Sequence, residues 1–276
     1  MSNKPVFTIA GDVCIDHNVV NNRKYISWGS SVMYMGRFLI NHPEFDLKII
    51  ASHGEDFCKY LHEIKIVNNS EAINTLVYEN IVMGDKRTQF CHNLSSSRPV
   101  EIDEPIRGVL KSTNIFIFAP LTPNYQPSYV QSLLKHVPEN CLKVLTPQGY
   151  MRHIDIDGLV TKSAFANEKY IVPLFDIVIV SDEDGVKPLE AAQRWVRFKK
   201  ELNVIVTQNK NGATLINKNG LQHIETVPVA VSDISDPVGS GDVFSIQTAL
   251  DYYENRDIVQ AIVAGNTTAR QKLLAS

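Results

Sequence analysis

The stretch Asp236-Pro-Val-Gly-Ser-Gly-Asp-Val-Phe244 decides the fold class of this 276-residue chain. Its Gly-x-Gly turn opens a predicted helix over 241–254, and a helix that begins in this way offers free backbone N–H groups to an anion. Phe244 stands where the dinucleotide fingerprint needs its third glycine, and no G-x-x-x-x-G-K-[ST] phosphate loop occurs anywhere in the chain. The stretch therefore predicts an anion site that belongs to neither of these two common nucleotide motifs.

Asp242 lies in the first turn of this helix, beside the expected anion. A carboxylate next to a bound phosphate is electrostatically unfavourable unless it takes part in the chemistry. Its evident use is to accept the proton of a hydroxyl group that attacks phosphorus. The competing interpretation is an ordinary turn followed by an acidic helix start, because such turns are common.

Upstream of this stretch, apolar runs that predict buried strands alternate with segments of helical periodicity. The strands are expected at 6–10, 47–51, 114–119, 142–146, 176–180 and 204–207, and the helices at 30–41, 56–63, 127–136, 188–202, 241–254 and 257–274. Two stretches, 75–93 and 213–226, have the alternation and turn residues of hairpins. This order predicts one α/β domain over residues 1–276, a doubly wound and mostly parallel sheet flanked by helices.

Composition excludes several classes of protein. Lys and Arg number 27 against 30 Asp and Glu, a net charge of −3, which argues against nucleic acid as the main partner. The longest apolar run, 170–180, is too short to span a membrane. The N-terminal residues show no secretory-signal pattern, so we expect no secretory signal. The eight histidines lack zinc-ligand spacing, and the four cysteines form no C-x-x-C pair. We expect reduced core thiols in a cytoplasmic protein that binds no membrane.

The motifs resemble those of the ribokinase/PfkB carbohydrate kinase family along nearly the whole chain. The 236–244 stretch is similar to its C-terminal signature D-T-x-G-A-G-D-x-F, and residues 6–16 resemble its first strand with the ending G-D-x-x-x-D. Trp28-Gly-Ser-Ser31, His53-Gly-Glu-Asp-Phe57 and Thr207-Gln-Asn-Lys-Asn-Gly212 resemble G-G-x-x, V-G-x-D-x and T-x-G-x-x-G. Thr146-Pro-Gln-Gly-Tyr-Met-Arg152 resembles the D-x-Q-G-x-x-R segment of a branch that includes inositol-type kinases.

The resemblance implies a ribokinase-like fold with a small β lid, whose strands would be inserted at about 17–28 and 75–93. It implies transfer of the γ-phosphoryl group of ATP, with Mg²⁺, to a hydroxyl of a small sugar, cyclic polyol or nucleoside. Asp242 would be the catalytic base, and the amides of Gly239, Ser240 and Gly241 would form the anion hole. Lid strands in this family can pair between subunits, so a monomer and a homodimer are both open.

The resemblance also assigns binding residues, and for three of them a plainer interpretation stays open. The acceptor would contact Asp12, Asp16, Gly29, Ser30, Gln148 and Arg152, the nucleotide would contact Thr207, Gly212 and Asn266, and Asp184 would reach the metal through water. The alternatives are a turn-capping carboxylate for Asp12, a surface arginine for Arg152 and a solvated helix residue for Asn266.

Four departures from the family pattern bear on the predicted metal, nucleotide and acceptor sites. The N-x-x-E motif becomes Ser181-Asp-Glu-Asp184, Asn209 replaces a glycine, and Trp28 stands where a second glycine is usual. Asn tolerates left-handed backbone, so the turn at Asn209 is expected to survive, whereas Trp28 would either stack on a ring or narrow the pocket. These departures motivate an alternative function, a catalytically weak ligand-binding or regulatory protein on the same scaffold.

Overall fold

A computed structural model describes residues 4–20, 22–62, 64–70, 72–83, 86–234 and 236–274. Its main sheet has the strand order β14-β13-β12-β11-β8-β7-β1-β4. The strands are β1 (Val6–Asp12), β4 (Asp46–Ser52), β7 (Thr113–Ala119), β8 (Leu142–Leu145), β11 (Ile177–Ser181), β12 (Asn203–Thr207), β13 (Ala213–Asn217) and β14 (Gly220–Ile224). The strands from β12 to β4 run parallel, and β13 and β14 extend one edge as an antiparallel hairpin.

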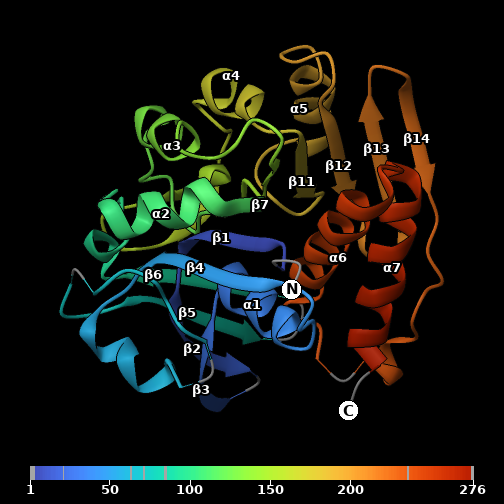
Figure 1. Ribbon diagram of the computed structural model, residues 1–276. Helices are drawn as coiled ribbons and strands as arrows, with labels where there is room; N and C mark the ends of the chain where they lie inside the picture. The colour runs from blue at the N-terminus through green and yellow to red at the C-terminus, as the bar shows by residue number, and fades with distance from the viewer. Residues whose placement is uncertain are drawn as a thin grey trace.

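Helices cover both faces of this sheet, as Figure 1 shows. One face packs on α1 (Ser31–Ile40), α6 (Ser240–Asn255) and α7 (Ile258–Leu274), and the other on α2 (Glu104–Ser112), α3 (Pro127–Leu134), α4 (Glu168–Ile171) and α5 (Pro188–Trp195). The apolar residues of the parallel strands are buried on both faces, which is why they read as continuous apolar runs in the sequence. The predicted doubly wound α/β fold is confirmed.

A second sheet of four strands lies at the lower left of Figure 1, and we call it the lid after the element expected from the sequence. Its order is β3-β2-β5-β6, from β3 (Arg23–Gly29), β2 (Cys14–Val20), β5 (Leu76–Met83) and β6 (Lys86–His92). Strands β2 and β5 pair in parallel, and the two outer pairings are antiparallel. The strands expected at about 17–28 and 75–93 are therefore present, and the expected turn at Gly84 and Asp85 lies outside the described residues. A further strand pair, β9 (Arg152–Ile154) and β10 (Val160–Lys162), follows the 3₁₀ turn η3 (Gln148–Met151).

Two predicted helices are shorter in the structure. The helix expected over 188–202 ends at Trp195 and continues as single turns. In these turns Lys199 bonds to Phe175 O (2.8 Å) and to an Asp176 oxygen (2.7 Å), just before β11. The helix expected over 56–63 is the 3₁₀ helix η1 (Glu55–Tyr60), and Glu63 is not described. The patterns had predicted no helix where α2 lies.

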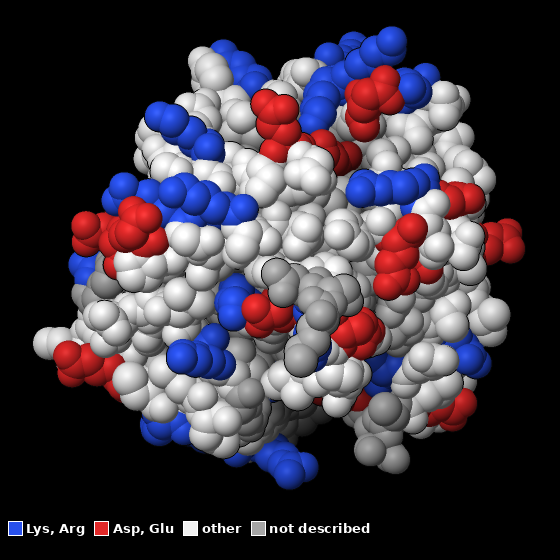
Figure 2. All heavy atoms as spheres, in the orientation of Figure 1, with Lys and Arg blue, Asp and Glu red and all other residues white. Residues whose placement is uncertain are grey.

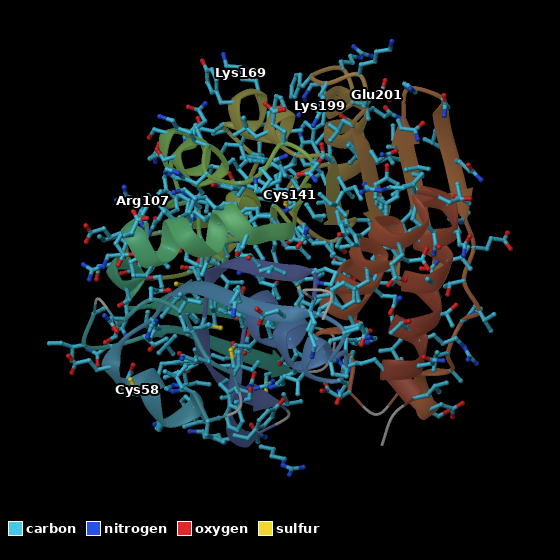
Figure 3. The ribbon with its side chains drawn as sticks, in the orientation of Figure 1. Cys58, Arg107, Cys141, Lys169, Lys199 and Glu201 are labelled. Carbon is cyan, nitrogen blue, oxygen red and sulfur yellow. The ribbon has the colours of Figure 1, made fainter. Side chains whose placement is uncertain are left out.

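The surface and the cysteines agree in part with the expectations from composition. Figure 2 shows Lys and Arg interspersed with Asp and Glu on the visible face. Cys14, Cys91 and Cys141 are buried free thiols, whereas Cys58 is exposed on η1, so the expectation of core thiols is wrong for Cys58. Figure 3 shows Cys58 and Cys141 in separate parts of the molecule. Among the described helices, none combines the length and apolar character that a membrane crossing requires.

Candidate active site

The candidate site lies where the carboxyl ends of the parallel strands meet the N-terminus of α6. Asp12 ends β1, Gln148 follows β8, Asp184 follows β11 and Thr207 ends β12. Because these strands run parallel, their carboxyl ends share one edge of the sheet, the usual ligand edge of open α/β folds. Residues that are far apart in the chain are thereby brought to one side of the molecule.

The turn before α6 has the geometry of an anion site. Gly239 is the N-cap residue with φ 79°, a left-handed conformation that favours glycine, and the helix begins at Ser240. A Cβ at Gly239 would lie 2.6 Å from a ring carbon of Tyr34, so a side chain has no room there either. A Cβ at Gly241 would meet nothing within 4 Å, which leaves open space over the first amides of the helix. The predicted anion hole of Gly239, Ser240 and Gly241 stays a prediction that this geometry supports.

Asp242 has the properties expected of a general base. Burial raises its pKa to about 6, and the nearby carboxylate of Asp184 acts in the same direction. A hydrogen bond from the Ser31 hydroxyl and the charge of Arg152 both work against this shift. A carboxylate with a pKa close to neutral is well suited to take a proton and later release it. Sequence reasoning had not found Ser31, although it directly follows Ser30 in the acceptor turn.

Arg152 is a half-buried cation with internal contacts rather than a fully exposed surface arginine. Its Nη1 donates to Leu121 O (3.2 Å), and its guanidinium carbon lies 5.0 Å from the centre of the Tyr78 ring. The Tyr78 hydroxyl donates to the same Leu121 oxygen (2.7 Å). The charge of Arg152 lowers the pKa of both Asp12 and Asp242. Arg152 thus supplies positive charge to a site that holds several carboxylates.

Gln148 and Asp184 hold each other in place. Gln148 Nε2 donates to Asp184 Oδ1 (3.1 Å), and the Ser181 backbone N–H donates to Asp184 Oδ2 (3.0 Å). Within the described residues, no cluster of three acidic, histidine or cysteine side chains forms a metal cage. Mg²⁺ commonly binds through one or two carboxylates together with substrate phosphates and water. Asp184 fits that pattern, because each of its oxygens keeps a second lone pair for a metal-bound water.

The lid contributes a polar cluster next to Asp16. Asn80 is almost fully buried and donates to Asp16 Oδ1 (3.3 Å) and Asn18 Oδ1 (3.2 Å), and its own oxygen accepts from Gln89 Nε2 (2.8 Å). Asn18 also donates to Ser27 Oγ (3.1 Å). The strand register places all five residues on one face of the lid. Sequence analysis had named only Asp16 of this lid cluster.

In the predicted acceptor turn, Gly29 and Ser30 have clear local roles in the fold. A Cβ at Gly29 would lie 1.9 Å from Asp16 Oδ2, so only glycine lets that carboxylate approach. Ser30 has φ 101° and caps α1, its side chain accepting from the Met33 N–H (3.2 Å). The Trp28 ring stacks on Tyr60, with 4.9 Å between ring centres. Trp28 therefore stacks on a ring of the protein itself.

Asp12 is fully buried, and its described hydrogen bonds are internal. Oδ2 accepts from the Leu121 N–H (2.9 Å) and Oδ1 from the Tyr125 hydroxyl (2.6 Å). Burial raises the pKa of Asp12, and these hydrogen bonds oppose that effect. This placement favours the alternative of a structural, turn-holding carboxylate over direct contact with the acceptor.

The turn from Thr207 to Gly212, which the resemblance assigns to the nucleotide, keeps its conformation although Asn209 replaces a glycine. Asn209 has φ 51° and Gly212 has φ 85°, so Asn209 adopts the left-handed backbone that was expected of it. Asn209 Nδ2 also donates to Glu183 Oε1 (2.9 Å), which joins the turn to the acidic loop after β11. The Thr207 carbonyl accepts from the Asp182 N–H (2.9 Å) of the same loop. Asn266 on α7 donates to Glu225 O (3.4 Å), an internal contact near the end of β14.

Comparison with known proteins supports the fold. No family model matches the chain, and no curated protein matches it in sequence. Among solved structures, a pyrophosphate-dependent kinase in the ribokinase family, complexed with a pyrophosphate analog and myo-inositol, is similar with TM-score 0.76 and 16% identity over 97% of this chain and 94% of that chain. Ribokinase from Thermotoga maritima gives 0.71 and 15% over 98% and 93%, and Anopheles gambiae adenosine kinase gives 0.77 and 15% over 100% and 97%. The chain therefore has the ribokinase-like fold.

Proposed function

We propose that this protein is a phosphotransferase that transfers the γ-phosphoryl group of ATP to a hydroxyl of a small sugar, cyclic polyol or nucleoside. The observation that carries the proposal is Asp242, whose pKa is raised to about 6 and which lies in the first turn of a helix behind a left-handed glycine. A base and an anion hole on the same turn are the two groups that phosphoryl transfer to a hydroxyl requires.

The reaction that these residues support is a direct transfer. The acceptor hydroxyl gives its proton to Asp242, and its oxygen forms a bond to the γ-phosphorus. The bond between that phosphorus and the bridging oxygen of the donor breaks, and ADP leaves with its electron pair. The first amides of α6 stabilise the charge on the transferring group, and the charge of Arg152 lies near enough to affect Asp242 itself.

Mg²⁺ would be held between the donor phosphates and Asp184, through water, and would neutralise phosphate charge. The protein's own contribution at this point is to fix the Asp184 carboxylate with Gln148 and the Ser181 N–H. Thr207, Gly212 and Asn266 remain the proposed nucleotide contacts.

On the acceptor side we propose the lid cluster together with Arg152 and Gln148. Carboxamide and carboxylate groups pair well with hydroxyl groups, which both donate and accept hydrogen bonds. This chemistry fits a sugar or cyclic polyol best. One structural neighbour is a kinase solved with myo-inositol, whereas another is an adenosine kinase, so nucleosides belong in the test.

The donor should be tested as well as the acceptor. The neighbour solved with myo-inositol is described as pyrophosphate-dependent, and a pyrophosphate donor would use the same anion hole without the nucleotide contacts. We expect ATP to be the donor. If the protein transfers from pyrophosphate but not from ATP, the assignments of the base and the anion hole stand. The assignment of Thr207, Gly212 and Asn266 as nucleotide contacts is then wrong.

The decisive experiment incubates the protein with Mg²⁺, either ATP or pyrophosphate, and a panel of sugars, inositols and nucleosides. We expect phosphorylation of at least one polyhydroxylated acceptor. The variant Asp242→Asn should lower kcat by about 10²- to 10⁴-fold with little effect on donor binding. An unchanged rate in Asp242→Asn would remove Asp242 as the base.

The alternative is a catalytically weak binding or regulatory protein on the same scaffold. It is favoured by Asp184, because both of its carboxylate oxygens already accept hydrogen bonds from the protein. Calorimetry with ATP in the presence and absence of Mg²⁺ separates the two functions. A kinase should bind the nucleotide more tightly with the metal, whereas binding that is indifferent to Mg²⁺, without transfer to any acceptor, would support the alternative.

A further inference from the structure

The first turn of α1 carries two side chains that reach the turn before α6. Ser31 donates a hydrogen bond to Asp242. Tyr34 follows three residues later and therefore projects from the same side of the helix. The helix begins directly after Gly29 and Ser30, the predicted acceptor turn. It thus connects the place where an acceptor would bind to the place where phosphoryl transfer would occur.

The ring of Tyr34 packs against the left-handed residue of the anion turn. A Cβ at Gly239 would lie 2.6 Å from Cδ1, 2.7 Å from Cγ and 3.1 Å from Cε1 of Tyr34, so ring and backbone are in close contact. The Arg37 guanidinium carbon lies 5.7 Å from the centre of the Tyr34 ring. Arg37 also donates to Trp28 O (3.2 Å), which ties it to the acceptor turn. The ring therefore contacts the anion turn directly and is linked to the acceptor turn through Arg37.

Carboxylates of the lid and of the anion turn act electrostatically on the Tyr34 hydroxyl. Burial raises the pKa of this hydroxyl, the charges of Asp16, Asp236 and Asp242 raise it further, and Arg37 opposes them. A phenol in these surroundings keeps its proton at neutral pH and is a hydrogen-bond donor. Among the residues that the structure describes, the hydroxyl has no hydrogen-bond partner. Nothing in the described protein uses this donor.

We propose that Tyr34 contacts the acceptor: its ring supports the transfer turn at Gly239, and its hydroxyl donates a hydrogen bond to an acceptor oxygen beside Asp16. The inference rests on the proposed function and adds a residue to it. A substrate hydroxyl can donate one hydrogen bond and accept another. In this proposal it donates to the Asp16 carboxylate and accepts from the Tyr34 hydroxyl. This pairing recognises a hydroxyl group rather than a carboxylate or an apolar substituent.

The test uses the full chain and two variants that separate the hydroxyl from the ring. In Tyr34→Phe the ring remains, so the dissociation constant of the acceptor and its KM should rise about 3- to 10-fold, with kcat and the donor KM within twofold of wild type. In Tyr34→Ala the turn also loses its support, so kcat should fall as well. The matched control is Tyr170→Phe on α4, where the tyrosine is 52% exposed and distant in sequence from both turns.

Acceptor binding is measured by calorimetry with the same panel of sugars, inositols and nucleosides, so the result does not depend on turnover. A Tyr34→Phe variant with wild-type acceptor affinity and KM overturns the proposed contact and leaves the kinase function intact. Wild-type protein that binds an acceptor but transfers no phosphoryl group overturns the kinase function, while the calorimetry still decides the role of Tyr34. Wild-type protein that binds no member of the panel contradicts both.

Discussion

At the scale of single residues, Asp242 determines how the proposed activity depends on pH. Its pKa of about 6 means that a substantial fraction of the protein carries a protonated, inactive base in mildly acidic solution. We therefore expect kcat/KM to fall below a pH of about 6 and to level off above it. The measurement is a rate profile from about pH 4.5 to 9 with the acceptor found in the panel. An acid limb near 4, the range of an ordinary aspartate, would contradict the raised pKa.

Ser31 lowers the pKa of that base through its hydrogen bond, so its removal has a predictable sign. In Ser31→Ala the charged carboxylate loses a donor, and the acid limb of the rate profile should move to higher pH by up to about one unit. Ser31→Thr keeps the hydroxyl and serves as the control, with the limb expected in its wild-type position. A limb that stays in place in Ser31→Ala would show that the hydrogen bond does not tune Asp242.

At the scale of elements, one central side chain, Asn80, joins the lid cluster that we propose for the acceptor. Asn80 bonds to Asp16, Asn18 and Gln89, so Asn80→Leu removes three hydrogen bonds at once. We expect the acceptor KM to rise about tenfold or more, with the donor KM unchanged. The control is Thr88→Ala, an exposed position whose register places it on the opposite face of the lid. Equal effects on acceptor and donor KM would indicate general damage rather than lost recognition.

The lid cluster also shows where sequence reasoning stops. Alternation in 75–93 is a local signal, and it predicted the β5–β6 hairpin. The pairing that brings Asn80 beside Asn18 is a parallel one between strands more than 60 residues apart, and no local pattern encodes it. The same limit applies to Tyr34, whose role depends on contact with Gly239 across the fold. Local motifs identified the predicted base and anion turn. Most of the residues that surround them are brought there by long-range pairing, which local motifs do not encode.

Helix α2 is a different case, because a local signal was present and was missed. Asp103 caps the helix by accepting from the Ile106 N–H (3.0 Å), and Pro105 follows in the first turn. An aspartate before a proline at this spacing is a typical helix start.

The error at α5 was of the opposite kind, because the predicted helix was longer than the observed one. Helical periodicity continued past Trp195, whereas in the structure Lys199 bonds to Phe175 and Asp176 just before β11, and local periodicity does not encode such long-range contacts.

At the scale of the whole molecule, the ionised form of Asp242 lowers the stability of the folded protein. An ordinary aspartate ionises near pH 3.8, whereas Asp242 keeps its proton in the folded protein up to about pH 6. The folded state therefore holds a proton that the unfolded state has lost. The stability that this proton contributes is present below about pH 4 and is lost as the pH rises through 6. The pKa of Asp12 is raised as well. Asp12 is present in both wild type and an Asp242 variant, so its effect on stability cancels when the two proteins are compared.

Asp242→Asn should thus be a protein of strongly reduced activity that is more stable than wild type at neutral pH. Asparagine carries no charge to bury, so the variant should gain roughly 1–3 kcal/mol above pH 7, and the gain should shrink toward zero below about pH 4. Thermal unfolding of both proteins between pH 4 and 8 measures the difference. Glu201→Gln is a suitable control, because Glu201 lies on the surface and pairs with Lys218. A variant that loses stability at every pH would mean that Asp242 is held as a satisfied structural carboxylate, and the assignment of a destabilised base at this helix start would then be wrong.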